Sequence, residues 1–112
     1  MIETYQLDGT NEPNIVKSIL DKLNGARDIV NPATIELQKP EVKLSGHTIS
    51  FETTKGQFVV ITFGYGQTLC QVWENEPAFR KYPEGYTRPA RQYKHDGTDY
   101  PSAVAACLEL LR

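Results

Sequence analysis

Three closely spaced turn signals in the middle of the chain constrain its fold more than any other feature. They lie at residues 45–46 (SG), 54–56 (TKG) and 64–67 (GYGQ), and the segments between them are rich in alternating apolar residues. Glycine-containing turns between alternating segments are typical of antiparallel hairpins. Read as loops of two, three and four residues, the three turns predict a β-meander.

The loop lengths determine which residues lie opposite each other, and the positions of the apolar side chains show which loop lengths are consistent with a single core face. The loop at 54–56 pairs Ile49 with Ile61, and the loop at 64–67 pairs Ile61 with Cys70. The loop at 45–46 places Val42 opposite Ile49. Because a slip of one residue exchanges the two faces of a strand, other loop lengths would scatter these apolar partners. The predicted core face consists of Val42, Leu44, Ile49, Phe51, Val59, Ile61, Phe63, Cys70 and Val72.

The opposite face of the same sheet is predicted to carry a second apolar group. In this register Phe58 faces Trp73, with Val60 and Leu69 on the same side. Burial of such surface is favourable by roughly 25 cal/mol per Å². We therefore expect this group to be covered by the segment after Trp73, by a helix, by a second copy of the chain or by another molecule.

Two amphipathic helices are predicted near the ends of the sequence. The first begins after Asn11 as N-cap and ends at Gly25, and its apolar stripe is Ile15, Val16, Ile19, Leu20 and Leu23. The second begins near Tyr100 with Asp99 as N-cap, and its stripe is Val104, Cys107, Leu108 and Leu111.

Residues 2–7 and 33–38 are predicted to add short strands. The fold class is therefore α+β: an antiparallel four- to five-stranded meander sheet with an N-terminal and a C-terminal helix packed on it. We expect one domain over residues 1–112, because a chain of this length forms a single core.

Composition narrows the class of protein further. The net charge is −2, and neither a secretory leader nor an apolar stretch long enough to span a membrane is present in the sequence. Each of the two cysteines, Cys70 and Cys107, lies in an apolar run. We therefore expect a reduced, cytoplasmic protein that does not enter a membrane.

Residues 74–100 form the most unusual part of the sequence, and we expect them to be an extended Tyr/Arg/Pro-rich loop or flap. Connections this long are uncommon unless they are functional. Between residues 78 and 95 there are five cations and one anion. Tyrosine and arginine are enriched in binding hot spots, and loop tips often carry recognition residues. The candidate partner-binding residues are Tyr65, Trp73, Phe79, Arg80, Lys81, Tyr82, Tyr86, Arg88, Arg91, Tyr93 and Lys94.

The residue pattern does not favour an enzyme. Cys70 with His47 or His95 could form a nucleophile and base, but its position on the predicted core face indicates packing. His95, Asp96 and Asp99 lack a further ligand at a recognised metal-binding spacing, so a polar turn explains them better. The glycines at 64–66 precede a strand, whereas phosphate loops precede a helix. No catalytic residue, metal or cofactor is predicted.

Two functions remain, and no motif assigns the chain to a family. The first is a small non-enzymatic protein-interaction module of the adaptor or inhibitor type, or a mobile-element accessory protein. Such a module would bind another protein or a second copy of itself through the Tyr/Arg-rich segment. The alternative is a single-stranded nucleic-acid-binding protein that uses the same aromatic and basic residues. The negative net charge places the alternative second.

Overall fold

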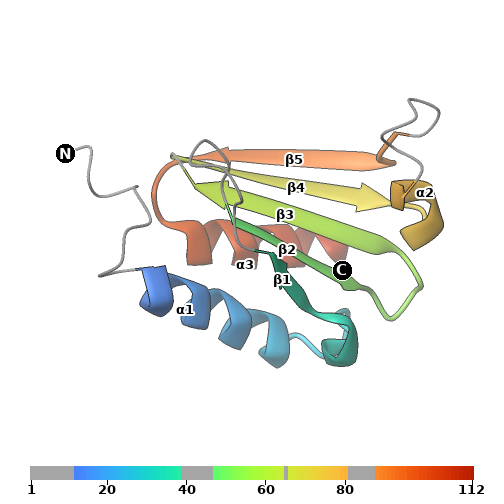
Figure 1. Cartoon of the computed structure of the whole chain (residues 1–112), viewed down its shortest axis with the longest axis horizontal. Helices are drawn as coiled ribbons and strands as arrows, with labels where there is room; N and C mark the ends of the chain where they lie inside the picture. Colours follow the sequence, from blue (N-terminus) through green and yellow to red (C-terminus); the bar gives the residue numbers. More distant parts are fainter. Residues whose placement is uncertain (1–11, 39–46, 65, 81–87) are drawn as a thin grey trace.

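The computed structural model describes residues 12–38, 47–64, 66–80 and 88–112, and these residues form an α+β fold (Figure 1). The helices are α1 (Glu12–Gly25), a 3₁₀ turn η2 (Pro32–Thr34), α2 (Glu76–Arg80) and α3 (Tyr100–Leu111). The strands are β1 (Glu36–Gln38), β2 (His47–Glu52), β3 (Phe58–Gly64), β4 (Gln67–Trp73) and β5 (Arg91–Asp96).

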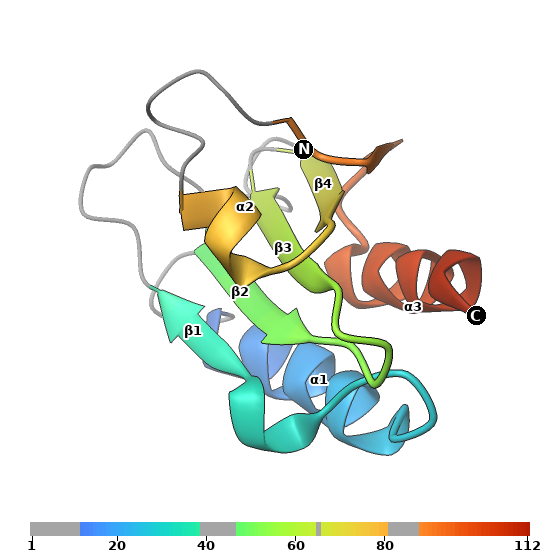
Figure 2. The ribbon, with the colours of Figure 1, turned by 90° about the vertical axis from the view of Figure 1, so that its right-hand side faces the viewer.

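The strands form one antiparallel sheet in the order β1-β2-β3-β4-β5, which is a meander. Helices α1 and α3 lie on one face of this sheet, and α2 lies on the other face near one end of the strands (Figures 1 and 2). The predicted fold class is confirmed. The strand expected at residues 2–7 lies outside the described residues.

The predicted register of the central strands is confirmed. Ile61 lies opposite Ile49 on one side and opposite Cys70 on the other. Gly56 has a φ of 87°, the left-handed conformation that the three-residue loop requires. The turn after β3 is tighter than expected, because Gly64 already pairs with Gln67. The pairing of the two strands is the same in either case.

The hairpin predicted at residues 45–46 is wrong in its pairing. The residue opposite Ile49 is Leu37 of β1 and not Val42. Leu37 and Val42 are both apolar residues of alternating segments, so the polar/apolar pattern alone could not decide which of them lies opposite Ile49. The difference comes from tertiary hydrogen bonds. Asn31 N donates to Glu52 O (3.0 Å), and Glu52 N donates to Thr34 Oγ1 (2.8 Å). These two bonds bring the chain at η2 beside the end of β2, so that the next residues pair with it.

The main core lies between the sheet and the two long helices. All predicted core-face residues that fall in the described ranges are buried, and Val42 and Leu44 lie outside those ranges. Helix α1 contributes Ile19 and Leu23, both with no exposed surface. Helix α3 buries its whole predicted stripe, from Val104 to Leu111. Amphipathic helices on an apolar sheet face are thus sufficient to form this layer.

The start of α3 is held in place by polar contacts. Asp99 caps the helix, with its Oδ1 accepting a hydrogen bond from Ser102 N (3.2 Å). The hydroxyl of buried Tyr100 accepts a hydrogen bond from Gly66 N (2.9 Å), and its ring centroid lies 5.7 Å from that of Phe63. The turn between β3 and β4 is therefore connected directly to α3.

Within the described ranges, no helix is both long and apolar enough to cross a membrane.

Replacing Leu23 tests the packing of α1 on the sheet. We expect Leu23→Ala to lower the free energy of unfolding by about 2–5 kcal/mol, because it leaves a cavity in the main core. Leu110→Ala is the matched control, since Leu110 is 48% exposed, and should change that free energy by no more than about 0.5 kcal/mol. Urea denaturation measures both. Equal losses for the two variants would contradict the described position of α1.

Candidate functional site

The second apolar group of the sheet is covered by α2. Phe58 and Trp73 lie opposite each other, as predicted, and pack with Val60 into a separate buried cluster. Phe79 of α2 lies over them, with ring-centroid distances of 5.1 Å to Phe58 and 5.4 Å to Trp73. Asn75 starts this short helix, because its Oδ1 accepts a hydrogen bond from Ala78 N (2.9 Å). The cover is thus the beginning of the 74–100 segment itself.

Three aromatic residues of the predicted partner-binding set are used in internal packing. Trp73 is 0% exposed and therefore offers no surface to a partner in this structure. Phe79 is half-buried against Phe58 and Trp73. Tyr93 is half-buried against the main core and lies opposite Cys70. The sequence pattern marked these side chains as aromatic and clustered, which is equally true of a core and of a binding surface.

The cations of the same set that fall in the described ranges lie on the surface. Arg80 forms an i,i+4 ion pair with Glu76 (3.0 Å), and its guanidinium lies 5.5 Å from the ring centroid of Phe79. Arg88, Arg91 and Lys94 are exposed, and none of them forms an ion pair with another residue in the described part of the chain. We call Arg88, Arg91 and Lys94 the basic edge. Tyr65, Lys81, Tyr82 and Tyr86 lie outside the described residues.

Residues 74–100 are more regular than the extended loop or flap that we predicted. Besides α2, the segment contains β5, which pairs with β4 from Val72↔Arg91 to Gln67↔Asp96. Hydrogen bonds continue beyond both ends of β5: Ala90 N donates to Val72 O (2.8 Å) and Gly97 N to Gly66 O (2.7 Å). The sequence of β5, RQYKHD, is polar because an edge strand needs few apolar contacts. Its hydrophobic signal was therefore too weak to identify it as a strand.

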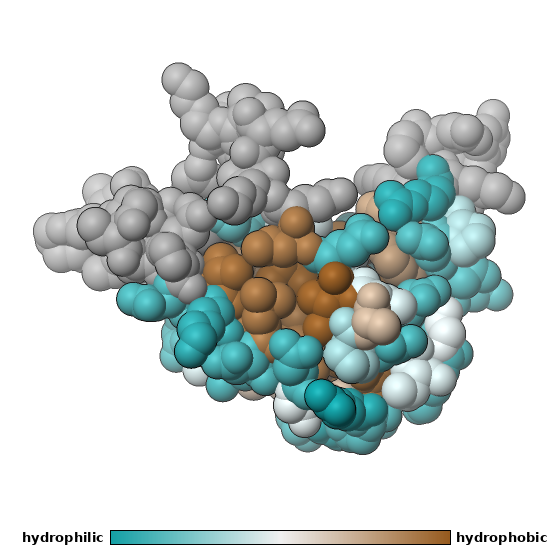
Figure 3. Space-filling model, turned by 60° about the horizontal axis from the view of Figure 1, so that its bottom comes forward, coloured by the Kyte–Doolittle hydropathy of each residue, from teal (hydrophilic) through white to brown (hydrophobic). Residues whose placement is uncertain are grey.

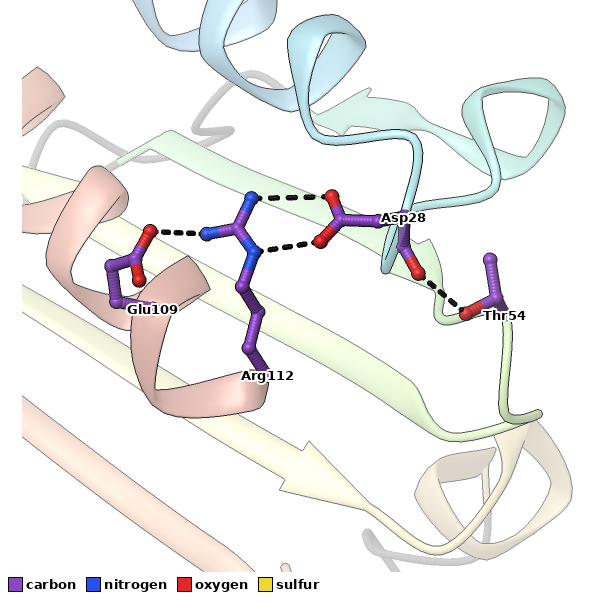
Figure 4. Close-up of polar contacts among 4 residues, drawn as sticks. All are labelled: Asp28, Thr54, Glu109 and Arg112. Atoms are coloured by element: carbon purple, nitrogen blue, oxygen red, sulfur yellow. Dashed lines mark hydrogen bonds and ion pairs between the residues drawn. The ribbon is translucent and has the colours of Figure 1, made fainter.

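A second polar cluster joins three distant parts of the chain (Figure 4). Arg112 donates from Nε and Nη2 to the two carboxylate oxygens of Asp28, at 2.7 and 3.2 Å, and also pairs with Glu109. Thr54 donates its hydroxyl to Asp28 O (3.0 Å). The hydrogen bond from Arg112 lowers the pKa of Asp28. Asp28, Thr54 and Arg112 border a cleft of about 200 Å³, whose other lining residues are Ile29, Thr53, Lys55, Gln57 and Leu111.

This polar cluster is best described as a connection between elements. Its one cation, Arg112, is paired with both carboxylates, and the carboxylate side chains are exposed. Exposed ion pairs contribute little to stability and do not by themselves activate a nucleophile or an acid. The cluster attaches the end of α3 to the loop after α1 and to the turn between β2 and β3.

The residues considered for catalysis take structural positions. Cys70 and Cys107 are both buried, on β4 and α3, and share a hydrogen bond between their thiols. This hydrogen bond, together with burial, raises the pKa of Cys70. A buried thiol that resists ionisation is a poor nucleophile. His47 is buried and stacks on Phe63, with a centroid distance of 5.6 Å.

His95 and Asp96 end β5, and Asp99 caps α3; all three line a shallow cleft beside the start of that helix. In the described ranges, no group of three or more His, Cys, Asp or Glu residues is arranged to hold a metal ion. On the helical side, Figure 3 shows a hydrophobic area with polar residues along part of its border. The half-buried apolar side chains packed against the main core from α1 are Ile15, Val16 and Leu20.

Comparison with known proteins assigns neither a family nor a function to the chain. No protein-family model matches the chain, and no curated protein or solved structure shows significant similarity to it.

Replacing Phe79 tests the contact between α2 and the sheet. We expect Phe79→Ala to shift the fluorescence emission of Trp73, the only tryptophan of the chain, to longer wavelength because water reaches the indole ring. The lost apolar burial should lower the free energy of unfolding by about 1–2 kcal/mol. Glu76→Ala, which removes only an exposed ion pair of α2, is the control and should leave the emission unchanged. An unshifted spectrum in Phe79→Ala would show that α2 does not cover this cluster.

The Asp28–Arg112 pair predicts a small dependence of stability on pH. A carboxyl group with a lowered pKa in the folded state stabilises the fold above its ordinary pKa, and this contribution is lost as the pH falls through the folded-state value. We expect Asp28→Asn to lower the melting temperature by a few degrees at most at neutral pH, and this difference should shrink as the pH falls below the ordinary pKa of the carboxyl group. Thermal melts across pH measure this, with exposed Asp21→Asn as control. A difference that persists in acid would contradict this account.

Proposed function

We propose that this chain is a small, non-enzymatic protein-interaction module of the adaptor or inhibitor type that acts in the cytoplasm and binds an acidic protein partner through the basic edge. The observation that carries the proposal is the exposure of Arg88, Arg91 and Lys94 without an ion-pair partner in the described part of the chain. Cations that are neither buried nor paired are free to contact carboxylates of another molecule.

The distribution of charge supports an acidic partner. Residues 78–95 carry a net charge of +4, whereas the whole chain carries −2, which leaves −6 on the remaining residues. Such an uneven distribution orients a charged partner as it approaches and increases the rate of association. An acidic surface would be attracted to the basic edge and repelled by most of the rest of the molecule.

Single-stranded nucleic acid is the second candidate, because phosphates would be attracted to the same cations. Binding of single strands also relies on exposed aromatic rings on which bases stack. Of the described aromatic candidates, Trp73 is buried, and Phe79 and Tyr93 are half-buried in packing contacts. This arrangement favours a protein partner over nucleic acid.

Charge reversal of the basic edge tests the proposed function. The probes are a fluorescent peptide rich in glutamate and a single-stranded oligonucleotide of equal net charge. We expect the peptide to bind at low salt and to lose affinity by about tenfold or more in Arg88→Glu/Arg91→Glu/Lys94→Glu, because three attractive contacts become repulsive. The control variant is Lys17→Glu/Lys22→Glu/Lys55→Glu, which changes the same charge at exposed positions on α1 and on the turn after β2.

The two probes separate the two candidates. The proposal requires tighter binding of the peptide than of the oligonucleotide at about 50 and about 200 mM salt. Tighter binding of the oligonucleotide, with a steep loss of affinity as salt rises, would support nucleic acid. Equal effects of the two triple variants would show that net charge matters and the basic edge does not.

A further inference from the structure

The outer side of β5 is the longest unpaired strand edge in the described sheet. β5 is the last strand in the sheet order, and no described element lies beyond it (Figure 1). The other edge strand, β1, has three residues, whereas β5 has six. Unpaired backbone groups along a strand edge can form hydrogen bonds with a further strand.

The hydrogen bonds of β5 show which of its backbone groups face outward. Gly97 N donates to Gly66 O, so the backbone groups of Gly97 face β4. In an antiparallel ladder the direction alternates from residue to residue. The backbone groups of Tyr93 and His95 therefore face β4, and those of Gln92 and Lys94 face away from the sheet. An added strand would meet the N–H and C=O of Gln92 and Lys94.

The side chains of β5 disfavour a second copy of the same strand. A symmetric antiparallel pair centred on Lys94 would place two lysines opposite each other. A pair centred on Tyr93 would place Arg91 opposite His95 and Lys94 opposite Gln92 of the second copy, so neither cation would meet a carboxylate, and a pair centred on His95 would overlap only at residues 94–96. Like charges directly opposite each other destabilise a strand pair. A strand that carries carboxylates forms favourable pairs with the same cations.

We propose that the partner binds as an extended acidic segment, which adds a sixth strand to the sheet along β5. This inference rests on the proposed function and specifies how the partner is held. Backbone hydrogen bonds to Gln92 and Lys94 would supply the pairing, and carboxylates beside Arg91 and Lys94 would supply the selectivity. Arg91 and Lys94 point to opposite faces of the sheet, so the added strand needs acidic side chains on both of its faces.

Amide hydrogen exchange tests this mode of binding directly. The probe is a short, capped peptide that repeats glutamate, aspartate and valine in that order, so that carboxylates lie on both faces of the added strand. In the free chain, the amides of Tyr93 and His95 should exchange slowly and those of Gln92 and Lys94 rapidly. With the peptide bound at saturation, the exchange of the Gln92 and Lys94 amides should slow by about tenfold or more.

A proline substitution separates strand addition from simple charge attraction. Lys94→Pro removes the outward N–H, and proline is tolerated on an edge strand where its missing N–H faces solvent. Lys94→Ala removes the same charge but keeps the N–H. We expect peptide binding to be weakened in Lys94→Ala and abolished in Lys94→Pro, with circular dichroism confirming that both variants fold. The wild-type chain with a peptide N-methylated at alternate residues gives the same test without a variant.

Each result decides between strand addition and the proposed function. If the peptide binds but Lys94→Pro behaves like Lys94→Ala and N-methylation has no effect, strand addition is wrong and the proposed function stands. If no acidic peptide binds at low salt, both are wrong. If the Gln92 and Lys94 amides are already protected in the free chain and its solution mass is that of a dimer, a second copy occupies the edge and the inference is overturned.

Discussion

The burial of β3 on both of its faces is the constraint on which the rest of this structure depends. Ile61 and Phe63 point into the main core, while Phe58 and Val60 point to the opposite side, and all four are buried. A strand with two apolar faces needs a cover on each of them. Helices α1 and α3 cover the first face (Figure 2), and α2 covers the second near Trp73. The short helix α2 is therefore needed to bury the second apolar face of the sheet.

This second cover explains why the candidate site differs from a simple aromatic and basic patch. Phe79 is needed to bury Phe58 and Trp73, and Tyr93 packs against the main core from β5. Arg88, Arg91 and Lys94 have no such structural task, because a charged group is costly to bury without a partner. They remain at the surface, and β5 carries Arg91 and Lys94 along an open edge. Packing has thus separated the aromatic residues from the cations, although they alternate in the sequence.

Some elements could be predicted from local patterns, and others could not. The helices at residues 12–25 and 100–111 have cap residues and apolar stripes that can be read from the sequence. At the 54–56 turn, a three-residue loop keeps Ile49 and Ile61 on the same face of the sheet. The partner of β2 could not be predicted, because Leu37 and Val42 fit its core face equally well. β5 could not be recognised, because five of its six residues are polar or charged. A strand at an edge is held mainly by backbone hydrogen bonds, which do not require apolar side chains and so cannot be detected from hydrophobicity.

The sequence by itself determined the fold class, the register of β2, β3 and β4, and the meeting of Phe58 with Trp73, because these follow from the spacing of turns and the alternation of apolar residues. The tertiary structure alone decided that β1 pairs with β2, that α2 covers the second apolar cluster, and that β5 forms the edge of the sheet. These choices depend on contacts between residues far apart in the chain, such as Thr34 with Glu52. Local periodicity carries no information about such contacts.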